Sequence, residues 1–221
     1  MKQNSLYAIV VILLILTSCK SSDPVKPEEI TSGYKVGDFA QGGVVFYVDA
    51  TGAHGLVYPA PELLTTFKAL WSPIQASTGT YVLTDSTIGS GQKNTSSIVS
   101  KYGSGTYTAK TCEDLVTGGY SDWYLPSIFE LSEILRNKNI LPGIQNSTFY
   151  RSSTLTSRDP YNTGAVTVLS LTLHGVSTPS GGWYWLIWGI DTQTGKLSTD
   201  VMLHANGGKN NEASFIPVRS F

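Results

Sequence analysis

Residues 118–135 read GGYSDWYLPSIFELSEIL, and this stretch carries the clearest structural signals in the chain. Glycine tolerates the positive φ angles that follow a helix end. Gly118 and Gly119 therefore predict the end of a helix that begins near Thr108. We expect the chain to turn sharply there before a second helix starts.

The second helix is predicted to begin at Ser127. Pro126 disfavours the helical conformation at the residue before it. The Ser127 hydroxyl can accept a hydrogen bond from the Glu130 amide while the Glu130 carboxylate reaches back, and such a cap contributes about 1 kcal/mol. Apolar residues then recur at helical spacing and predict one buried face. They are Ile128, Leu131, Ile134 and Leu135.

Asp122 and Glu130 are the candidate catalytic carboxylates of this stretch. Turn chemistry accounts for Asp122 and helix capping accounts for Glu130, so we favour a structural role for both. The aromatic and apolar residues between them, 123–125, are expected to lie in the joint between the two helices.

The first 18 residues predict a lipoprotein signal peptide. Lys2 precedes the apolar run Tyr7–Leu16, which is shorter than the roughly 20 residues of a membrane-spanning helix. The sequence LTSC at 16–19 resembles a bacterial lipobox, which implies cleavage before Cys19 and acylation of that residue. Several acyl chains on one cysteine give a stable membrane anchor. An ordinary secretory signal with an incidental cysteine is the alternative.

Residues 19–33 are predicted to be the lipidated cysteine and a disordered tether, because they are polar, contain proline and lack apolar periodicity. Lys20 stands where an aspartate would resemble an inner-membrane retention signal. We therefore expect an outer-membrane lipoprotein that faces the periplasm or the cell surface. Residues 34–221 suit one domain with one hydrophobic core.

Charge and cysteine content narrow the function classes. The chain has 15 Lys and Arg against 16 Asp and Glu, so it has no excess of basic residues. We therefore expect no nucleic-acid partner. With Cys19 committed to lipid, Cys112 has no disulfide partner. It falls on the apolar face of the helix near 108–117, where a free cysteine packs as a small hydrophobe. The alternative, a reactive thiol, has no local signature.

Strands are predicted near both ends of the domain with helices between them, which indicates an α+β fold. The C-terminal strand is expected to return beside the N-terminal hairpin. The predicted strands are 44–48, 55–58, 148–154, 165–173, 183–190, 196–202 and 214–221, with 183–190 pairing with 196–202. A short helix is expected at 94–101 and irregular structure over 59–92.

Two late segments form the candidate ligand site. On a strand, Trp183 and Trp185 would share one face, with Trp188 following them. Aromatic faces stack on sugar rings, and core packing is the alternative. The polar loop 204–212 supplies amide groups able to bind hydroxyls, and a solvated loop is the alternative. Its candidate binding residues are Asn206, Asn210 and Asn211.

The signals of an enzyme are missing from the sequence. It has no metal-ligand spacing, no nucleophile elbow and no phosphate loop, so we expect no catalytic activity, metal or cofactor. The histidines are His54, His174 and His204. His54 ends a hairpin turn, where a solvated role is favoured. A cleft that joined two of these histidines to a carboxylate would favour an enzyme.

Several segments resemble the bacterial Lcl C-terminal-like domain family, whose function is unknown. A domain of this family also forms the end of a collagen-like adhesin. The resemblance covers nearly all of residues 34–221, and the run WYLPS followed by Glu-Leu is its most specific part. The segments are GDFAQGGVVF at 37–46, GLV at 55–57, residues 109–114, GGYSDWYLPS at 118–127, Glu130-Leu131, YRSST at 150–154 and PVRSF at 217–221.

The order of elements also looks like a C-type-lectin-like fold, with two to three helices packed on antiparallel strands and paired terminal strands. Calcium is not implied, because the acidic or amide pair around a proline is missing and Trp188 is followed by Gly-Ile-Asp. The adhesin relative is thought to bind anionic glycosaminoglycans. The balanced charge of this chain argues against such a ligand.

These observations predict a surface-anchored lipoprotein with a non-catalytic, lectin-like domain that binds a glycan or another surface macromolecule in adhesion. The alternative is an envelope structural or assembly protein that acts through protein–protein contacts. An enzyme is the third reading. Fold alone does not decide among them.

Overall fold

The computed structural model describes residues 33–73, 82, 84–158, 166–168, 171–173, 184–203 and 212–221, all within the unit Thr31–Phe221. For 157–158, 166–168, 171–173, 184–186 and 198–203 it describes the backbone alone. The predicted signal peptide, Cys19 and the tether up to residue 32 lie outside these ranges. Within the described ranges, no helix is both long enough and apolar enough to cross a membrane.

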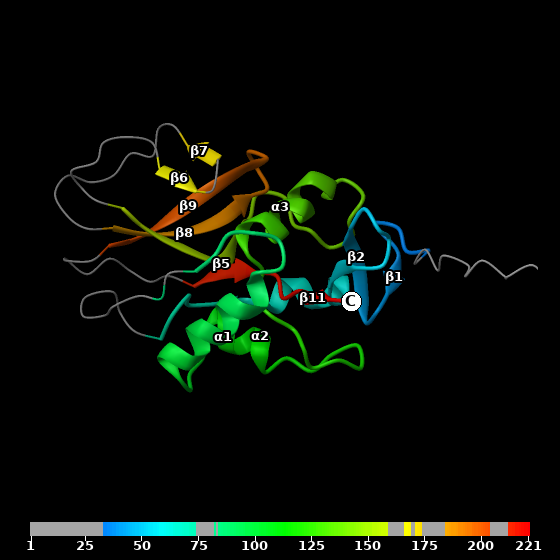
Figure 1. The fold of residues 1–221 in the computed structure, drawn as a ribbon, viewed down its shortest axis with the longest axis horizontal. Helices are drawn as coiled ribbons and strands as arrows, with labels where there is room; N and C mark the ends of the chain where they lie inside the picture. The colour runs from blue at the N-terminus through cyan, green and yellow to red at the C-terminus, as the bar shows by residue number, and fades with distance from the viewer. Residues whose placement is uncertain are drawn as a thin grey trace, which may run out of the picture. The chain divides into compact units, whose positions relative to one another are not determined.

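The first sheet joins the two ends of the domain, with strands in the order β1, β2, β3, β11. These strands are β1 Phe39–Ala40, β2 Gly43–Val48, β3 Gly55–Tyr58 and β11 Arg219–Ser220. β2 and β3 form the predicted hairpin, and β11 pairs antiparallel with β3, with Arg219 opposite Val57. The predicted return of the C-terminal strand to the N-terminal hairpin is therefore confirmed (Figure 1).

The second sheet has the strand order β4, β10, β5, β8, β9. Its strands are β4 Lys68–Ala69, β10 Ala213–Phe215, β5 Phe149–Arg158, β8 Tyr184–Asp191 and β9 Lys196–Leu203. β8 and β9 are antiparallel neighbours, which confirms the pairing predicted for 183–190 with 196–202. β10 runs parallel to β5, so the sheet is mixed. Together the sheets and helices form the predicted α+β fold.

Two single strands predicted from alternation are each divided in the structure. Residues 165–173 contain β6 Val166–Val168 and β7 Leu171–Leu173, which pair antiparallel with each other. Residues 214–221 contain β10 and β11, which belong to different sheets. Pro217 lacks the amide hydrogen that a continuous strand needs, and the chain crosses between the sheets there. The first pattern shifts phase where Val168 and Leu169 follow each other, and Pro217 interrupts the second, so both segments carry a mark of the division.

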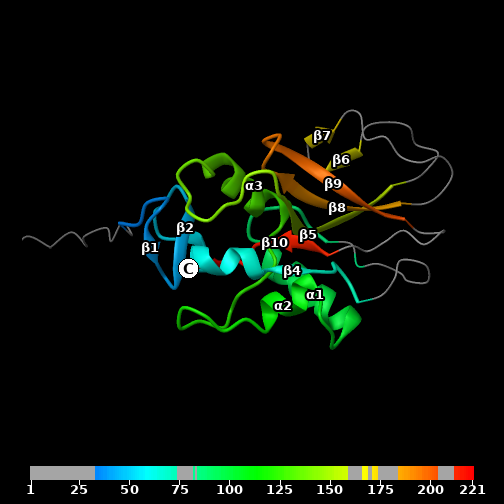
Figure 2. The same cartoon turned by 180° about the vertical axis from the view of Figure 1, so that it is seen from behind.

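Three α-helices lie between the strand regions in the described chain: α1 Gly91–Tyr102, α2 Thr108–Glu113 and α3 Ile128–Asn137. α1 includes the helix predicted at 94–101 and ends at Gly103, whose φ is +70°. The 59–92 region, predicted to be irregular, contains the 3-10 helix η1 Pro61–Thr66 and the short strand β4. α1 and α2 lie side by side in both views (Figures 1 and 2).

The first predicted helix is shorter than expected. α2 ends at Glu113, and the two glycines form a separate turn in which Thr117 and Tyr120 pair. Both glycines do have positive φ, +61° at Gly118 and +84° at Gly119. At Gly118 the reason is also steric, because a Cβ there would lie less than 3.0 Å from the Gly42 backbone.

α3 connects the two sheets. Its capping box between Ser127 and Glu130 is present as predicted, and the helix contacts β2, β5 and β8. Cys112 is fully buried beside this core, and burial raises the pKa of its thiol well above the usual value. The predicted packing role of Cys112 is thus confirmed. The predicted stripe Ile128, Leu131 and Ile134 is buried, and Leu135 packs partly buried against the same core.

Gly118→Ala is expected to lower the free energy of unfolding by about 2–5 kcal/mol, because it combines a left-handed backbone with a clash against Gly42. Urea unfolding of the full-length chain in detergent measures this loss. Gly119→Ala is the matched control, since its φ is also positive but a Cβ would meet no atom within 4 Å. It should cost about 1–2 kcal/mol. Equal losses in the two variants would contradict the steric explanation.

Candidate functional site

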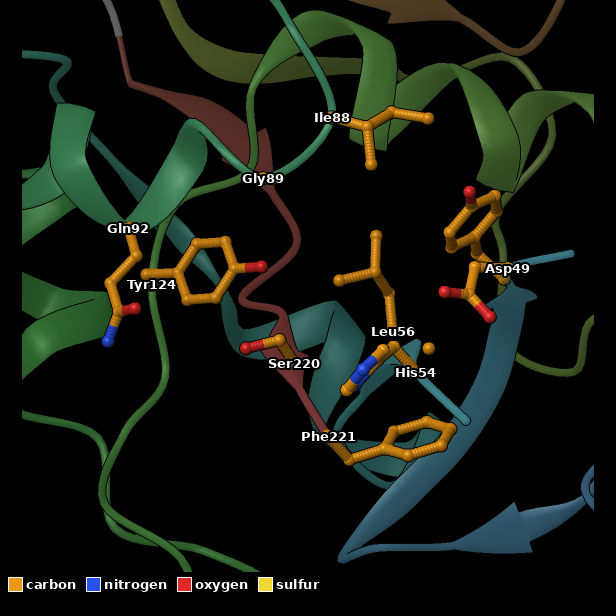
Figure 3. Close-up of a pocket in the computed structure, with 11 residues that line it drawn as sticks. Asp49, His54, Leu56, Ile88, Gly89, Gln92, Tyr124, Ser220 and Phe221 are labelled. Atoms are coloured by element: carbon orange, nitrogen blue, oxygen red, sulfur yellow. The ribbon is translucent and has the colours of Figure 1, made fainter. Parts of the chain in front are cut away.

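A pocket of about 480 Å³ lies where the β2–β3 hairpin, the loop before α1 and the C-terminal strand meet (Figure 3). Its volume is within the roughly 300–1,000 Å³ of small-molecule sites. Asp49, His54 and Phe221 lie on one side of the pocket in this view, and Tyr124 and Gln92 on the opposite side.

The hairpin turn fixes the acidic side of the pocket. Asp49 Oδ1 accepts hydrogen bonds from the amide and the hydroxyl of Thr51, at 3.0 and 2.6 Å, and the Asp49 amide donates to the His54 carbonyl at 2.8 Å. The Thr51 hydroxyl, followed by the backbone amides of His54 and Thr51, holds the pKa of the Asp49 carboxyl below its ordinary value. Asp49 is therefore an ionised carboxylate at neutral pH, beside the exposed His54.

The opposite side of the pocket is built on a buried carboxylate. Glu130 Oε1 accepts from the Gly89 amide at 2.9 Å and from the Tyr124 hydroxyl at 3.2 Å, while Oε2 accepts from the Ser127 amide at 2.7 Å. Burial raises the pKa of Glu130 although these donors act against the rise. Burial and the neighbouring Glu130 also raise the pKa of Tyr124, so its phenol stays protonated.

Phe221 forms an apolar wall whose position is set by two contacts. Its ring meets the Tyr34 ring edge to face, with centroids 5.3 Å apart at 83°. The ring also lies against Gly55, where a Cβ would come within 3.0 Å of it. Backbone hydrogen bonds of 3.1 Å in both directions between Gly55 and Phe221 complete the arrangement. Glycine is therefore required at the start of β3.

Arg219 holds the C-terminal strand in place. Its Nε donates to Asp122 Oδ1 at 2.6 Å, its guanidinium stacks 3.7 Å above the centre of the Tyr120 ring, and a second nitrogen donates to the Gln41 carbonyl at 3.3 Å. Asp122 and Glu130 thus have separate partners. Glu130 has the helix-capping role favoured by the sequence, whereas Asp122 forms an ion pair with Arg219 in place of the predicted turn contact.

The structure places the three tryptophans predicted to bind ligand differently. Trp188 is 1 % exposed, and its Nε1 donates to Thr156 Oγ1 at 3.0 Å, so this ring packs in the core. The backbone of Trp185 lies in β8 opposite Met202. Trp183 and the loop residues Asn206, Asn210 and Asn211 lie outside the described residues, as do His174 and His204.

Sequence reasoning did not identify this pocket, although it singled out His54, Tyr124 and Glu130. The residues that line the pocket come from segments that the sequence analysis had noted one by one. They are the hairpin, the WYLPS run and the C-terminal PVRSF. They are also segments on which the family resemblance rests. No group of three histidine, cysteine or acidic side chains able to hold a metal occurs among the described residues.

Comparison of the whole chain with protein-family models gives no match, and comparison with curated proteins gives none either.

Glu130→Gln is expected to lower the free energy of unfolding by about 1–3 kcal/mol. The substitution replaces one carboxylate oxygen by an NH2 group, which cannot accept a hydrogen bond, so a buried backbone donor, the Gly89 or the Ser127 amide, loses its partner. The raised pKa means that the folded state binds the Glu130 proton more tightly than the unfolded state. Its stabilising contribution is therefore present below the ordinary value of 4.5 and is lost as pH rises through the folded value. The difference in the free energy of unfolding between wild type and Glu130→Gln should therefore become smaller as the pH rises through the folded-state pKa of Glu130.

Urea unfolding at a series of pH values from 4 to 8 measures this gap. Glu133→Gln is the control, since Glu133 lies on the same helix and pairs with the exposed Arg136. This exposed pair should contribute under about 1 kcal/mol. A gap for Glu130→Gln that stays constant with pH would contradict the raised pKa.

Proposed function

We propose that this protein is a surface-anchored lipoprotein whose domain at 34–221, lectin-like in architecture, binds a glycan or another surface macromolecule without turnover. The binding site is the pocket between the β2–β3 hairpin, the loop before α1 and the C-terminal strand. The single observation that carries this proposal is the composition of the pocket, which sets apolar walls beside several hydrogen-bonding groups.

The apolar and polar parts of the pocket suit recognition of a ligand. Leu56, Ile88 and Phe221 provide apolar surface, while Gln92 and Ser220 provide hydrogen-bonding groups. Such a combination binds ligands through shape and fixes their orientation through a few polar contacts. The lipobox at Cys19 and the polar tether after it support a position at the membrane surface.

The state of the acidic groups supports binding without turnover. Glu130 and Tyr124 are hydrogen-bonded to each other and hold the fold, so neither is free to exchange a proton with a ligand. Asp49 is kept ionised by its turn, which suits an acceptor of hydrogen bonds better than a general acid. His54 lies beside Asp49 at the edge of the pocket.

A second candidate function is an envelope assembly protein, and exposed apolar side chains favour it. Phe39, Val116 and Ile140 are large, apolar and exposed, and protein interfaces use such residues. Capture of one defined envelope protein by the full-length chain, lost in Phe39→Ser and Ile140→Ser but retained when the pocket is filled, would favour this function.

Ile88→Trp is expected to weaken ligand binding about tenfold or more, because Ile88 is 42 % exposed at the pocket and a larger side chain there would fill it. The measurement is binding of the full-length chain in detergent to an array of neutral and acidic glycans. Ile140→Trp is the matched control, since Ile140 is 63 % exposed but does not line the pocket. It should change binding less than about twofold.

The same glycans should be recovered intact after incubation. Absence of binding to every glycan, or equal binding by both tryptophan variants, would contradict this proposal. Release of a shortened glycan by the wild-type chain would instead indicate an enzyme.

A further inference from the structure

The pocket has a charge that restricts its ligand. Of the residues that line it, Asp49 is ionised at neutral pH, and no lysine or arginine is among them in the described chain. An acidic ligand would meet the Asp49 carboxylate without a permanent cation to pair with, which costs binding free energy.

The Asp49 carboxylate can still accept a hydrogen bond from a ligand. Its Oδ1 accepts from the amide and the hydroxyl of Thr51, and the His54 backbone amide also interacts with the carboxylate. An ionised carboxylate has about four acceptor sites, so capacity remains for a donor in the pocket, and hydroxyl groups are such donors. A hydrogen bond to an ionised acceptor is about twice as strong as a neutral one.

The other polar groups of the pocket also match hydroxyls. The Gln92 amide both donates and accepts, and the His54 ring supplies a donor or an acceptor. The Ser220 hydroxyl interacts with the Tyr124 phenol and retains acceptor capacity. They lie around the same cavity as Asp49, from both sides of it (Figure 3). A ligand that carries hydroxyls on several edges would satisfy these groups together.

The apolar wall matches the remaining face of such a ligand. Phe221 is held by Tyr34 and Gly55, so its ring does not need to be ordered on binding. Leu56 also lines the pocket. An aromatic ring packs against the C–H face of a sugar, while the hydroxyls of the sugar point to the polar groups.

We infer that the pocket binds an uncharged sugar residue, with a hydroxyl on Asp49 and the apolar face of the sugar against Phe221. This inference rests on the proposed function and specifies its ligand class. Neutral sugars can donate a hydroxyl to the Asp49 carboxylate, whereas uronic acids and sulfated sugars bring a second negative charge to it.

The test compares neutral disaccharides with uronic-acid and sulfated disaccharides of similar size, by titration calorimetry on the full-length chain in detergent. Neutral sugars should bind about tenfold or more tightly than acidic ones. Asp49→Asn retains Oδ1 for Thr51 and removes the charge, so it should weaken neutral-sugar binding about tenfold.

Asp191→Asn is the matched control, because Asp191 Oδ1 also holds a turn, accepting from the Gln193 amide at 2.8 Å, and does not line the pocket. It should leave binding within about twofold. Gln92→Leu is the second test variant, since Gln92 is exposed on α1 and its loss leaves the core unchanged. It should weaken neutral-sugar binding about threefold or more.

The outcomes separate this inference from the proposed function. If acidic sugars bind more tightly than neutral ones and Asp49→Asn strengthens the binding of acidic sugars, the neutral-sugar inference is overturned while a glycan-binding function stands. If neutral sugars bind but Asp49→Asn and Gln92→Leu bind as wild type does, the assignment of the pocket is overturned. If the chain binds no glycan of either kind, the proposed glycan-binding function itself fails.

Discussion

The carboxylate of Glu130 is the interaction on which the arrangement of this domain depends. A buried carboxylate is costly unless donors surround it, and here the donors come from three places: the Gly89 amide before α1, the Ser127 amide at the start of α3 and the Tyr124 hydroxyl. The chain approaches so closely that a Cβ on Gly91 would lie less than 3.0 Å from this carboxylate. One side chain thus fixes where two helices begin and where one side of the pocket stands.

The Arg219 cluster sets the other limit of the pocket. Arg219 joins Asp122 and the Tyr120 ring, which are close in the sequence, to the Gln41 carbonyl, which belongs to a distant segment. Because Arg219 belongs to β11, these contacts also determine where Ser220 and Phe221 lie. The pocket is therefore bounded by groups that the fold already holds in place, and a pre-organised site loses little entropy when a ligand binds.

This arrangement separates two kinds of acidic group around one cavity. Glu130 is buried and uses both oxygens within the fold, and burial raises its pKa. Asp49 is solvated, and the hydrogen bonds of its turn lower its pKa. The first stabilises architecture, and the second is presented to a ligand. The late aromatic strand contributes differently, since Trp188 fills the core between the sheets rather than a surface.

Local sequence determined those features whose causes lie within a few residues. The capping box at Ser127 and Glu130, the β2–β3 hairpin and the packing of Cys112 follow from spacing and residue type, and the structure has all of them. Tertiary structure decided the end of α2, the division of residues 214–221 between two sheets and the pocket itself. Each depends on contacts between distant segments, such as Gly118 with Gly42 and Phe221 with Gly55. Periodicity reports which face of an element is buried, but it carries no information on which distant segment covers that face.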